Sequence, residues 1–209
     1  MTTGAGVYHA APHTPVVVPE HDTVFRLAQL VLLLDAAAQF HPDGVPLERL
    51  GVYDFIAANP LLMASAEDDP DRLELLMAGF DDRALSYASP AQRFATRRER
   101  LQHDLALLLA YDLATTAVRG HVLYRLTSAG HELTSRFTAM YAHSYTLAAN
   151  IVMNRLRKVS DSRLRECITD WTRLPISPTG IDLADLFTEP TGQEADDDTV
   201  GSSATGPTS

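Results

Sequence analysis

Apolar and polar positions along most of this chain repeat with the period of an α-helix. The segment from Asp22 to Gln39 is apolar nearly all round, which predicts a helix at the centre of a core, with Asp22 as its N-cap. The turn residues His41–Gly44 follow, and a second helix is predicted from about Pro46 until Asn59-Pro60 ends it. The pattern therefore predicts a mainly α fold whose first two helices are buried.

The third long helix is predicted to begin at Ser89-Pro90, an N-cap followed by proline at the first helical position. Two short runs of strand-forming residues come after it, Thr115–Arg119 and His121–Leu126. They flank Gly120, which can take the positive φ of a tight turn. Another helix begins after Thr127. A helix, a β-ribbon and a helix in this order indicate a winged-helix domain, with a helical core and a small β-wing.

More helices are predicted on either side of this module. The pattern after Thr127 predicts one long helix as far as Val159, and a last helix covers Asp161–Arg173. Residues 61–89 are predicted to be an insertion with an acidic start and one short helix around Arg72–Ala78. The winged-helix domain is predicted to cover residues 21–173, and it includes the insertion 61–89 and a C-terminal helical extension at 134–173. Residues 1–20 are predicted to be a disordered N-terminal segment, and residues 174–209 an acidic disordered tail.

The charge of the chain is uneven. The formal net charge is −10, but seven of the 27 acidic residues lie in Asp182–Ser209, which has no Lys or Arg. The rest of the chain carries 20 acids against 17 bases, a net charge of −3. Because a domain that binds DNA strongly is usually basic, any contact with nucleic acid must come from a local patch.

We expect a soluble cytoplasmic protein without a membrane partner. The N-terminal residues have no cationic start followed by an apolar run, so they predict no secretory signal. The most apolar stretch, Val24–Phe40, is too short and too polar to cross a bilayer. The single cysteine, Cys167, excludes an intramolecular disulfide and fits a reducing compartment.

The motifs of common enzymes and metal sites are missing from the sequence. It contains no GxSxG, no phosphate-binding glycine loop, no CxxC and no HExxH, and none of its eight histidines forms an i, i+4 pair within a predicted helix. The acids Asp68, Asp69 and Asp71 lack the spacing of a calcium loop and are expected to form a solvated acidic loop. We therefore expect no catalytic residue, no cofactor and no metal site.

Arginines gather on the third long helix and the wing. In a DNA-reading winged helix, arginines at these places contact phosphates or guanine edges. The alternative is a solvated charged face that pairs with Glu99, Asp104 and the acids of the insertion. The candidate contacts to DNA or to a partner protein are Arg93, Arg97, Arg98, Arg100, Arg119 and Arg125.

An aromatic band follows the wing. It either closes the core or leaves part of its surface for a partner or a second copy of the chain. Its candidate residues for a partner or dimer surface are Phe137, Met140, Tyr141 and Tyr145.

Several short stretches together carry a family resemblance, which covers roughly residues 22 to 173. They are the leucine-rich run Arg26–Asp35, Pro42-Asp43-Gly44, Leu47–Leu50, Tyr53-Asp54-Phe55, Arg97-Arg98-Glu99, Tyr124–Gly130 and the final helix with Trp171. In this order they resemble the middle component of prokaryotic ABC-three-component systems. Such systems pair an SMC/Rad50-like ABC ATPase with a variable effector and a small helical winged-helix linker.

The resemblance implies a non-enzymatic adaptor that links the ABC ATPase to the effector, both encoded nearby, in genome conflict or antiphage defence. By analogy with winged-helix accessory subunits of SMC complexes, it also implies a homodimer. The alternative from another class is a DNA-binding transcriptional regulator that reads its operator with Arg93, Arg97, Arg100 and Arg119. The helical order, the charge and the missing catalytic motifs favour the adaptor.

Overall fold

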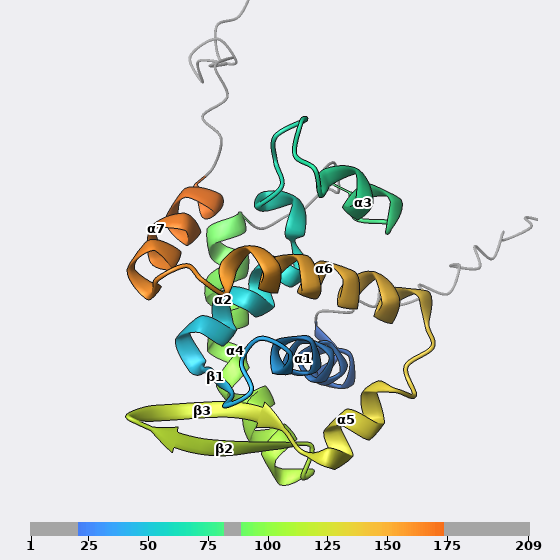
Figure 1. Cartoon of the computed structure of the whole chain (residues 1–209), viewed down its shortest axis with the longest axis vertical. Coiled ribbons are helices and arrows are strands. Elements are labelled where there is room, and N and C mark those ends of the chain that lie inside the picture. The colour runs from blue at the N-terminus through green and yellow to red at the C-terminus, as the bar shows by residue number, and fades with distance from the viewer. Residues whose placement is uncertain (1–20, 82–88, 174–209) are drawn as a thin grey trace, which may run out of the picture. The chain divides into compact units, whose positions relative to one another are not determined.

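The computed structural model describes residues 21–81 and 89–173, and there the chain is mainly helical with one small sheet (Figure 1). The predicted terminal segments 1–20 and 174–209 lie outside the described residues, as do residues 82–88 of the insertion. The elements are α1 Thr23–Ala38, β1 Val45–Pro46, α2 Leu47–Ala58, a 3-10 turn at Pro60–Leu62, α3 Arg72–Met77, α4 Pro90–Ala110, β2 Ala114–Arg119, β3 His121–Leu126, α5 Ser128–Thr134, α6 Met140–Leu156 and α7 Asp161–Thr172.

α1 lies at the centre of the core, as predicted. The Asp22 carboxylate caps it by accepting hydrogen bonds from the backbone N–H groups of Val24 at 2.8 Å and Phe25 at 3.3 Å. Every residue from Gln29 to Leu34 is buried, and the helix contacts α2, α4, α5, α6 and β3. Because neighbours surround it, α1 needs apolar side chains on most of its circumference.

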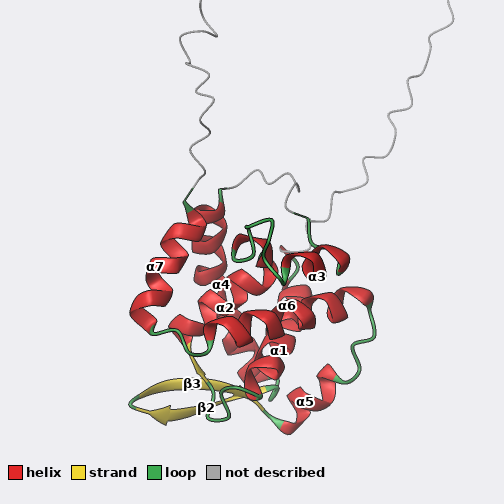
Figure 2. Ribbon diagram, turned by 45° about the horizontal axis from the view of Figure 1, so that its top comes forward, coloured by secondary structure: helices red, strands yellow, loops and turns green. Residues whose placement is uncertain are grey.

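The sheet is antiparallel with the strand order β1-β3-β2, and it lies at one end of the helices (Figure 2). The β2–β3 hairpin has the predicted turn, where Gly120 has a φ of +75°. β1 was not predicted. It pairs Val45 with Tyr124, and Gly44 just before it has a φ of +107° and a backbone that lies against the Tyr124 carbonyl. A side chain at Gly44 would block this approach.

The prediction of one long helix from Thr127 to Val159 is wrong, because α5 and α6 are separate helices. The hydroxyl of Thr134 donates to the His131 carbonyl and that of Ser135 donates to the Glu132 carbonyl, each at 2.7 Å. Such bonds compete with helix continuation, and the chain turns before Met140. α5 therefore packs beside α1 while α6 crosses over α1 and α2 (Figure 1).

The described part of the insertion is attached to α6. Leu61, Ala64 and Leu75 form a second small cluster with Ala148 and Ile151 of that helix. The short helix predicted around Arg72–Ala78 is present as α3. Leu75, which lies on α3, is fully buried.

The prediction of a solvated acidic loop is wrong for Asp69 and Asp71. The Arg155 guanidinium on α6 donates to Asp69 Oδ2 at 2.8 Å and to Asp71 Oδ2 at 2.5 Å. The hydrogen bonds from Arg155 lower the pKa of Asp69 from its ordinary value of 3.8. These acids therefore hold the insertion on the body of the protein.

α7 closes the described chain by packing against α4 and α2 with Leu164 and Ile168 buried. Its N-cap is Ser160, whose hydroxyl accepts a hydrogen bond from the backbone N–H of Arg163. In the part of the chain that the structure describes, no helix is long and apolar enough to cross a membrane.

Candidate partner interface

The six candidate arginines divide into an inner and an outer set. Arg93, Arg97 and Arg100 are partly buried and line a small pocket against α1 and α2. Arg98, Arg119 and Arg125 are exposed. The shared face that the helical pattern predicted is real, but it is turned toward the body of the protein.

Arg97 is a cross-link between helices. Its Nε and Nη2 atoms donate to the two carboxylate oxygens of Asp54 on α2, each at 2.9 Å, and Nη2 also donates to Gln29 on α1 at 3.1 Å. The Gln29 amide donates in turn to the Tyr141 hydroxyl on α6 at 2.5 Å. Only 14% of the Arg97 side chain is exposed. Its guanidinium is thus committed to the interior, where removing one partner leaves a costly buried charge.

A second buried pair joins α1 to α4. Arg26 donates from Nε and Nη2 to Asp104 at 2.8 and 2.9 Å. The sequence placed Asp104 among the surface partners of the arginine face, but its carboxylate points inward to Arg26. The sequence could have indicated both buried ion pairs, because Asp54 and Asp104 each lie within an apolar helical stripe. A carboxylate at such a position is buried and therefore needs a cationic partner.

The outer arginines lie on three elements. Arg98 on α4 pairs with Glu48 at the start of α2, and Arg119 at the end of β2 donates to Asp43 at 2.7 Å. Arg125 is exposed on β3. Exposed pairs of this kind contribute about 0–1 kcal/mol to stability, so a partner displaces them at little cost.

The aromatic band also divides. Tyr145 is fully buried, with its ring 6.1 Å from that of Tyr141, so the structure places it in the core and not on a partner surface. Phe137 is half-buried and packs against the same core. Met140, at 79% exposed, and Tyr141, at 43%, reach the surface at the start of α6. The physical reason is the break before α6, which turns one side of that helix onto α1.

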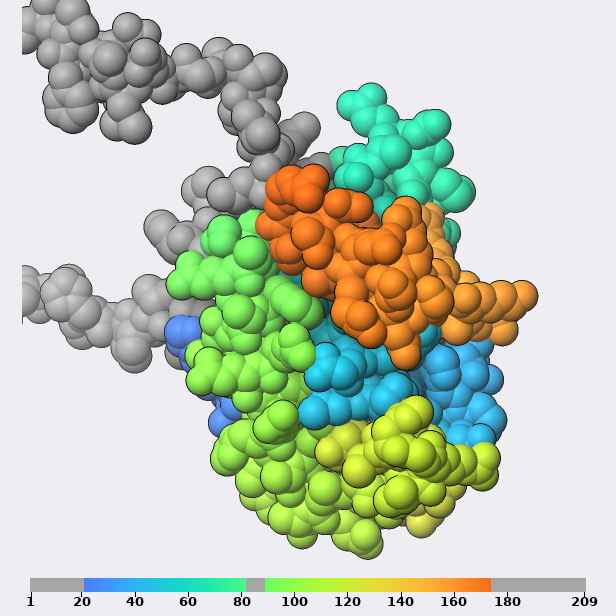
Figure 3. Space-filling view, turned by 90° about the vertical axis from the view of Figure 1, so that its left-hand side faces the viewer, coloured from blue at the N-terminus to red at the C-terminus, as the bar shows by residue number. Residues whose placement is uncertain are grey.

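A groove opens between α2, α4, β3 and α7. Figure 3 shows this face, with α2 at the centre bordered by α4, the hairpin and α7. Its volume is about 740 Å³, within the range of about 300–1,000 Å³ that ligand sites occupy. The apolar side chains that line it are Leu47, Val52, Phe94, Val122, Leu164 and Ile168. The charged ones include Glu48, Arg98 and Arg165, so the groove offers both apolar contact and charges of either sign.

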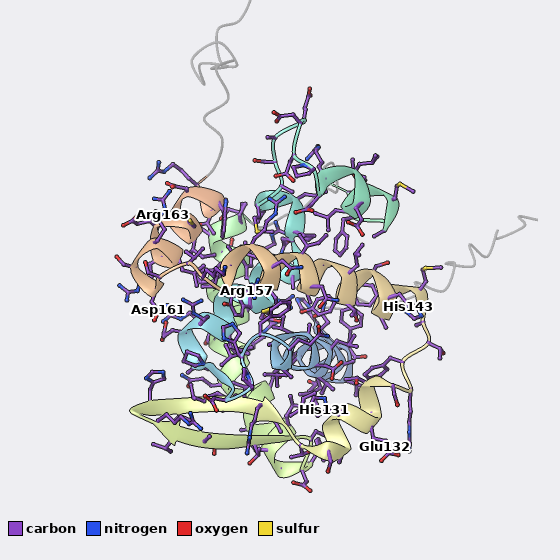
Figure 4. The ribbon with its side chains drawn as sticks, in the orientation of Figure 1. His131, Glu132, His143, Arg157, Asp161 and Arg163 are labelled. Atoms are coloured by element: carbon purple, nitrogen blue, oxygen red, sulfur yellow. The ribbon has the colours of Figure 1, made fainter. Side chains whose placement is uncertain are left out.

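Arg49 holds the groove's α7 wall in place. Its guanidinium donates to Asp161 at 2.6 Å, to the Val159 carbonyl at 2.5 Å and to the Tyr53 hydroxyl at 2.9 Å. Figure 4 shows Asp161 at the beginning of α7, on the side next to α2. Burial opposes the charge of Arg49, but the hydrogen bonds to Asp161 and Tyr53 outweigh it and raise its pKa. Arg49 was not among the predicted site residues, because it is a single base beside Glu48 in an otherwise largely apolar helix.

No cluster of three or more His, Cys, Asp or Glu side chains in the described ranges could hold a metal ion. The groove is lined mainly by apolar side chains and paired charges. The chemistry that this face supports is binding by burial and ion pairing.

Comparison with protein families gives a match over part of the chain. Residues 85–173 match the family described as ABC-three component (ABC-3C) system Middle Component 2. The matched segment runs from just before α4 to the end of α7 and supplies three of the four walls of the groove. It confirms the resemblance over these residues, while residues 22–84 lie outside the match. No curated protein and no solved structure matches the chain.

Proposed function

We propose that this protein, whose residues 85–173 match the Middle Component 2 family of ABC-3C systems, is a non-enzymatic adaptor. It joins an SMC/Rad50-like ABC ATPase to an effector protein in prokaryotic conflict or antiphage defence. The groove between α2, α4, β3 and α7 carries the proposal, because it is a partly apolar surface built largely from the matched segment. Membership of a multi-component system supports protein partners in general.

The proposed fold is a winged helix with added C-terminal helices. The elements run α1, β1, α2, α4, β2, β3, and the strands lie in the order β1-β3-β2. This arrangement resembles a helix-turn-helix unit followed by a hairpin wing. α4 then stands in the place of the recognition helix, and α3 with its loops is an insertion before it.

A protein partner suits this surface better than DNA. Recognition helices contact DNA with an outward face, but Arg97 of α4 is paired with a buried aspartate. Leu164 and Ile168 of α7 line the same groove as Phe94 and Arg98, so α7 stands beside the outward face of α4. On this face Arg98 is paired with Glu48 and Arg49 with Asp161, so these two arginines would have to give up a carboxylate before they could bind a phosphate.

The test is co-purification of the full chain with the ABC ATPase encoded beside it. The wild-type protein is expected to capture the ATPase. Val122→Glu places a charge in the groove, at a side chain that is already 44% exposed, and is expected to weaken capture at least tenfold. Met140→Glu makes the same chemical change at the start of α6, outside the groove, and is expected to retain capture.

One result would overturn the adaptor role, and a second would overturn the groove as its interface. Failure of the wild-type chain to bind any protein encoded beside it removes the adaptor role. Loss of capture in Met140→Glu with full capture in Val122→Glu moves the interface to the exposed Met140 and Tyr141. Light scattering of the purified chain shows whether that second surface joins two copies of the protein.

The second candidate, a DNA-binding transcriptional regulator, is favoured by the exposure of Arg98, Arg119 and Arg125 on the proposed recognition helix and wing. A mobility shift with the protein's own promoter tests it. A regulator would bind specifically and lose that binding in Arg119→Glu and Arg125→Glu. The adaptor proposal expects only weak binding that disappears with salt.

A further inference from the structure

A small pocket lined by arginines lies on the inner side of α4, apart from the groove. Its volume is about 180 Å³. The ionisable side chains of α1, α2 and α4 that line it are Arg26, Arg93, Arg97, Arg100, Asp54 and Asp104. Four guanidinium groups therefore meet two carboxylates in a confined space.

The two carboxylates are already neutralised. Asp54 accepts two hydrogen bonds from Arg97, and Asp104 accepts two from Arg26, all between 2.8 and 2.9 Å. In each of these bidentate pairs, two parallel N–H groups of the guanidinium donate to the carboxylate. An anion that enters the pocket thus meets ion pairs and not bare negative charge.

The Arg93 guanidinium has a hydrogen-bond donor that its neighbours do not use. Its Nη1 atom donates to the Asn59 side-chain oxygen at 2.7 Å, which is an uncharged partner. Its Nε atom is buried and has no hydrogen-bond partner among the described residues. A buried N–H of a charged group without an acceptor is unfavourable, and a bound oxyanion would relieve it.

The size of the pocket restricts the ligand. Sites for whole metabolites usually measure about 300–1,000 Å³, so a volume of about 180 Å³ suits one tetrahedral oxyanion. Thr96 and Gln92 add a hydroxyl and an amide to the lining, and Gln92 is exposed at the pocket's edge. A phosphoryl group can therefore enter while the molecule that carries it stays outside.

We propose that this pocket binds phosphate, either as inorganic phosphate or as the terminal phosphoryl group of a nucleotide. Arg93 supplies the charged donor, and Thr96 supplies a hydroxyl. The Arg26–Asp104 and Arg97–Asp54 pairs keep the walls rigid. Phosphate binding at this pocket requires no protein partner, so its test is independent of the adaptor role.

The experiment is calorimetric titration of the full chain with sodium phosphate, compared with sodium chloride at equal ionic strength. Phosphate is expected to bind and to raise the melting temperature, whereas chloride does neither. Arg93→Gln is expected to weaken phosphate binding by about tenfold or more, the effect of losing one charge-assisted hydrogen bond. Arg98→Gln is the matched control on the same helix, and it should bind phosphate like the wild type.

Two further arms complete the test. If ATP displaces phosphate and binds more tightly, the source is a nucleotide, and if it does not compete, the source is inorganic phosphate. Circular dichroism establishes whether Arg93→Gln is folded. If it is not, Thr96→Val decides the matter and is expected to weaken binding several-fold. Equal responses to phosphate and chloride, or unchanged binding in the folded Arg93→Gln or in Thr96→Val, would overturn the proposal.

Discussion

At the scale of single residues, the hydroxyl of Tyr145 is a local weakness of the core. The side chain is fully buried, and its oxygen has no hydrogen-bond partner among the residues that the structure describes. Burial raises the pKa of this phenol well above its ordinary value of 10.0, and the negative charge of Asp54 adds to that effect. The ring contributes packing, but the hydroxyl adds a desolvation cost.

Tyr145→Phe is therefore expected to stabilise the protein. Removing an unsatisfied buried hydroxyl should raise the free energy of unfolding by about 1 kcal/mol, measured by urea denaturation. Tyr141→Phe is the matched control, because its hydroxyl accepts the Gln29 amide hydrogen bond, and this variant should be less stable than the wild type. A loss of stability in Tyr145→Phe would show that the hydroxyl has a partner after all.

The helical period predicted that several arginines share one side of α4, but not the direction in which that side faces. The positions of Arg93, Arg97 and Arg100 on one side of α4 follow from the helical period. Their burial depends on Asp54, which is 43 residues away from Arg97, and on the packing of α4 against α2. The sequence did contain one indication of this buried ion pair, which is the position of Asp54 within an apolar helix. An aspartate carboxylate is rarely buried unless it is paired with a cation.

At the scale of elements, Gly130 fixes how α5 meets the hairpin. A Cβ atom at this position would lie 2.2 Å from the Leu113 carbonyl oxygen and 3.0 Å from a methyl group of Leu126. The Leu126–Gly130 stretch of the resemblance thus has a steric basis. α5 can start directly after β3 only if this residue has no side chain.

Gly130→Ala is expected to destabilise the protein by about 1–3 kcal/mol, the usual cost of forcing an extra methyl group into a closed contact. Thermal and urea unfolding measure it. Gly51→Ala in α2 is the contrast, because its Cβ would meet Leu101 at an ordinary 3.5 Å. That variant should be neutral or more stable by up to about 1 kcal/mol, since alanine favours a helix. Equal effects of the two changes would refute the steric explanation.

Helix positions were predictable to within a few residues where the apolar period is long, as in α1, α4 and α7. Two features were missed because they depend on contacts or short polar runs. β1 is only two residues long, and its partner Tyr124 lies far along the chain. The break between α5 and α6 arises from hydroxyl groups that bond back to the helix, which the apolar period does not record.

At the scale of the whole molecule, two groups make stability fall as the solution becomes acidic. Burial, with a smaller contribution from Arg49, lowers the pKa of His41 from 6.5. The unfolded chain therefore binds this proton first, and stability is lost as pH falls from 6.5 toward the lowered pKa. Asp69, whose pKa is lowered from 3.8 by Arg155, loses its stabilising effect in a second window below that value.

The melting temperature is therefore expected to fall as the pH drops below 6.5, and to fall again as the pH drops below 3.8. His41→Gln should flatten the first decrease and leave the second, which differential scanning calorimetry over a pH series would show. Arg155→Gln should instead reduce the second decrease. A first decrease of the same size in His41→Gln would assign it to other histidines.

The hydrogen bonds at the centre of the core also have a consequence for the order in which the chain is made. Arg97 and Asp54 are 43 residues apart, Arg26 and Asp104 are 78 apart, and Gln29 and Tyr141 are 112 apart. α1 is the first described helix to leave the ribosome, but its partner α6 is synthesised more than a hundred residues later. The apolar residues Leu30–Leu34 are thus fully enclosed only after α6 has been synthesised, so the earliest described helix is among the last to be completely buried.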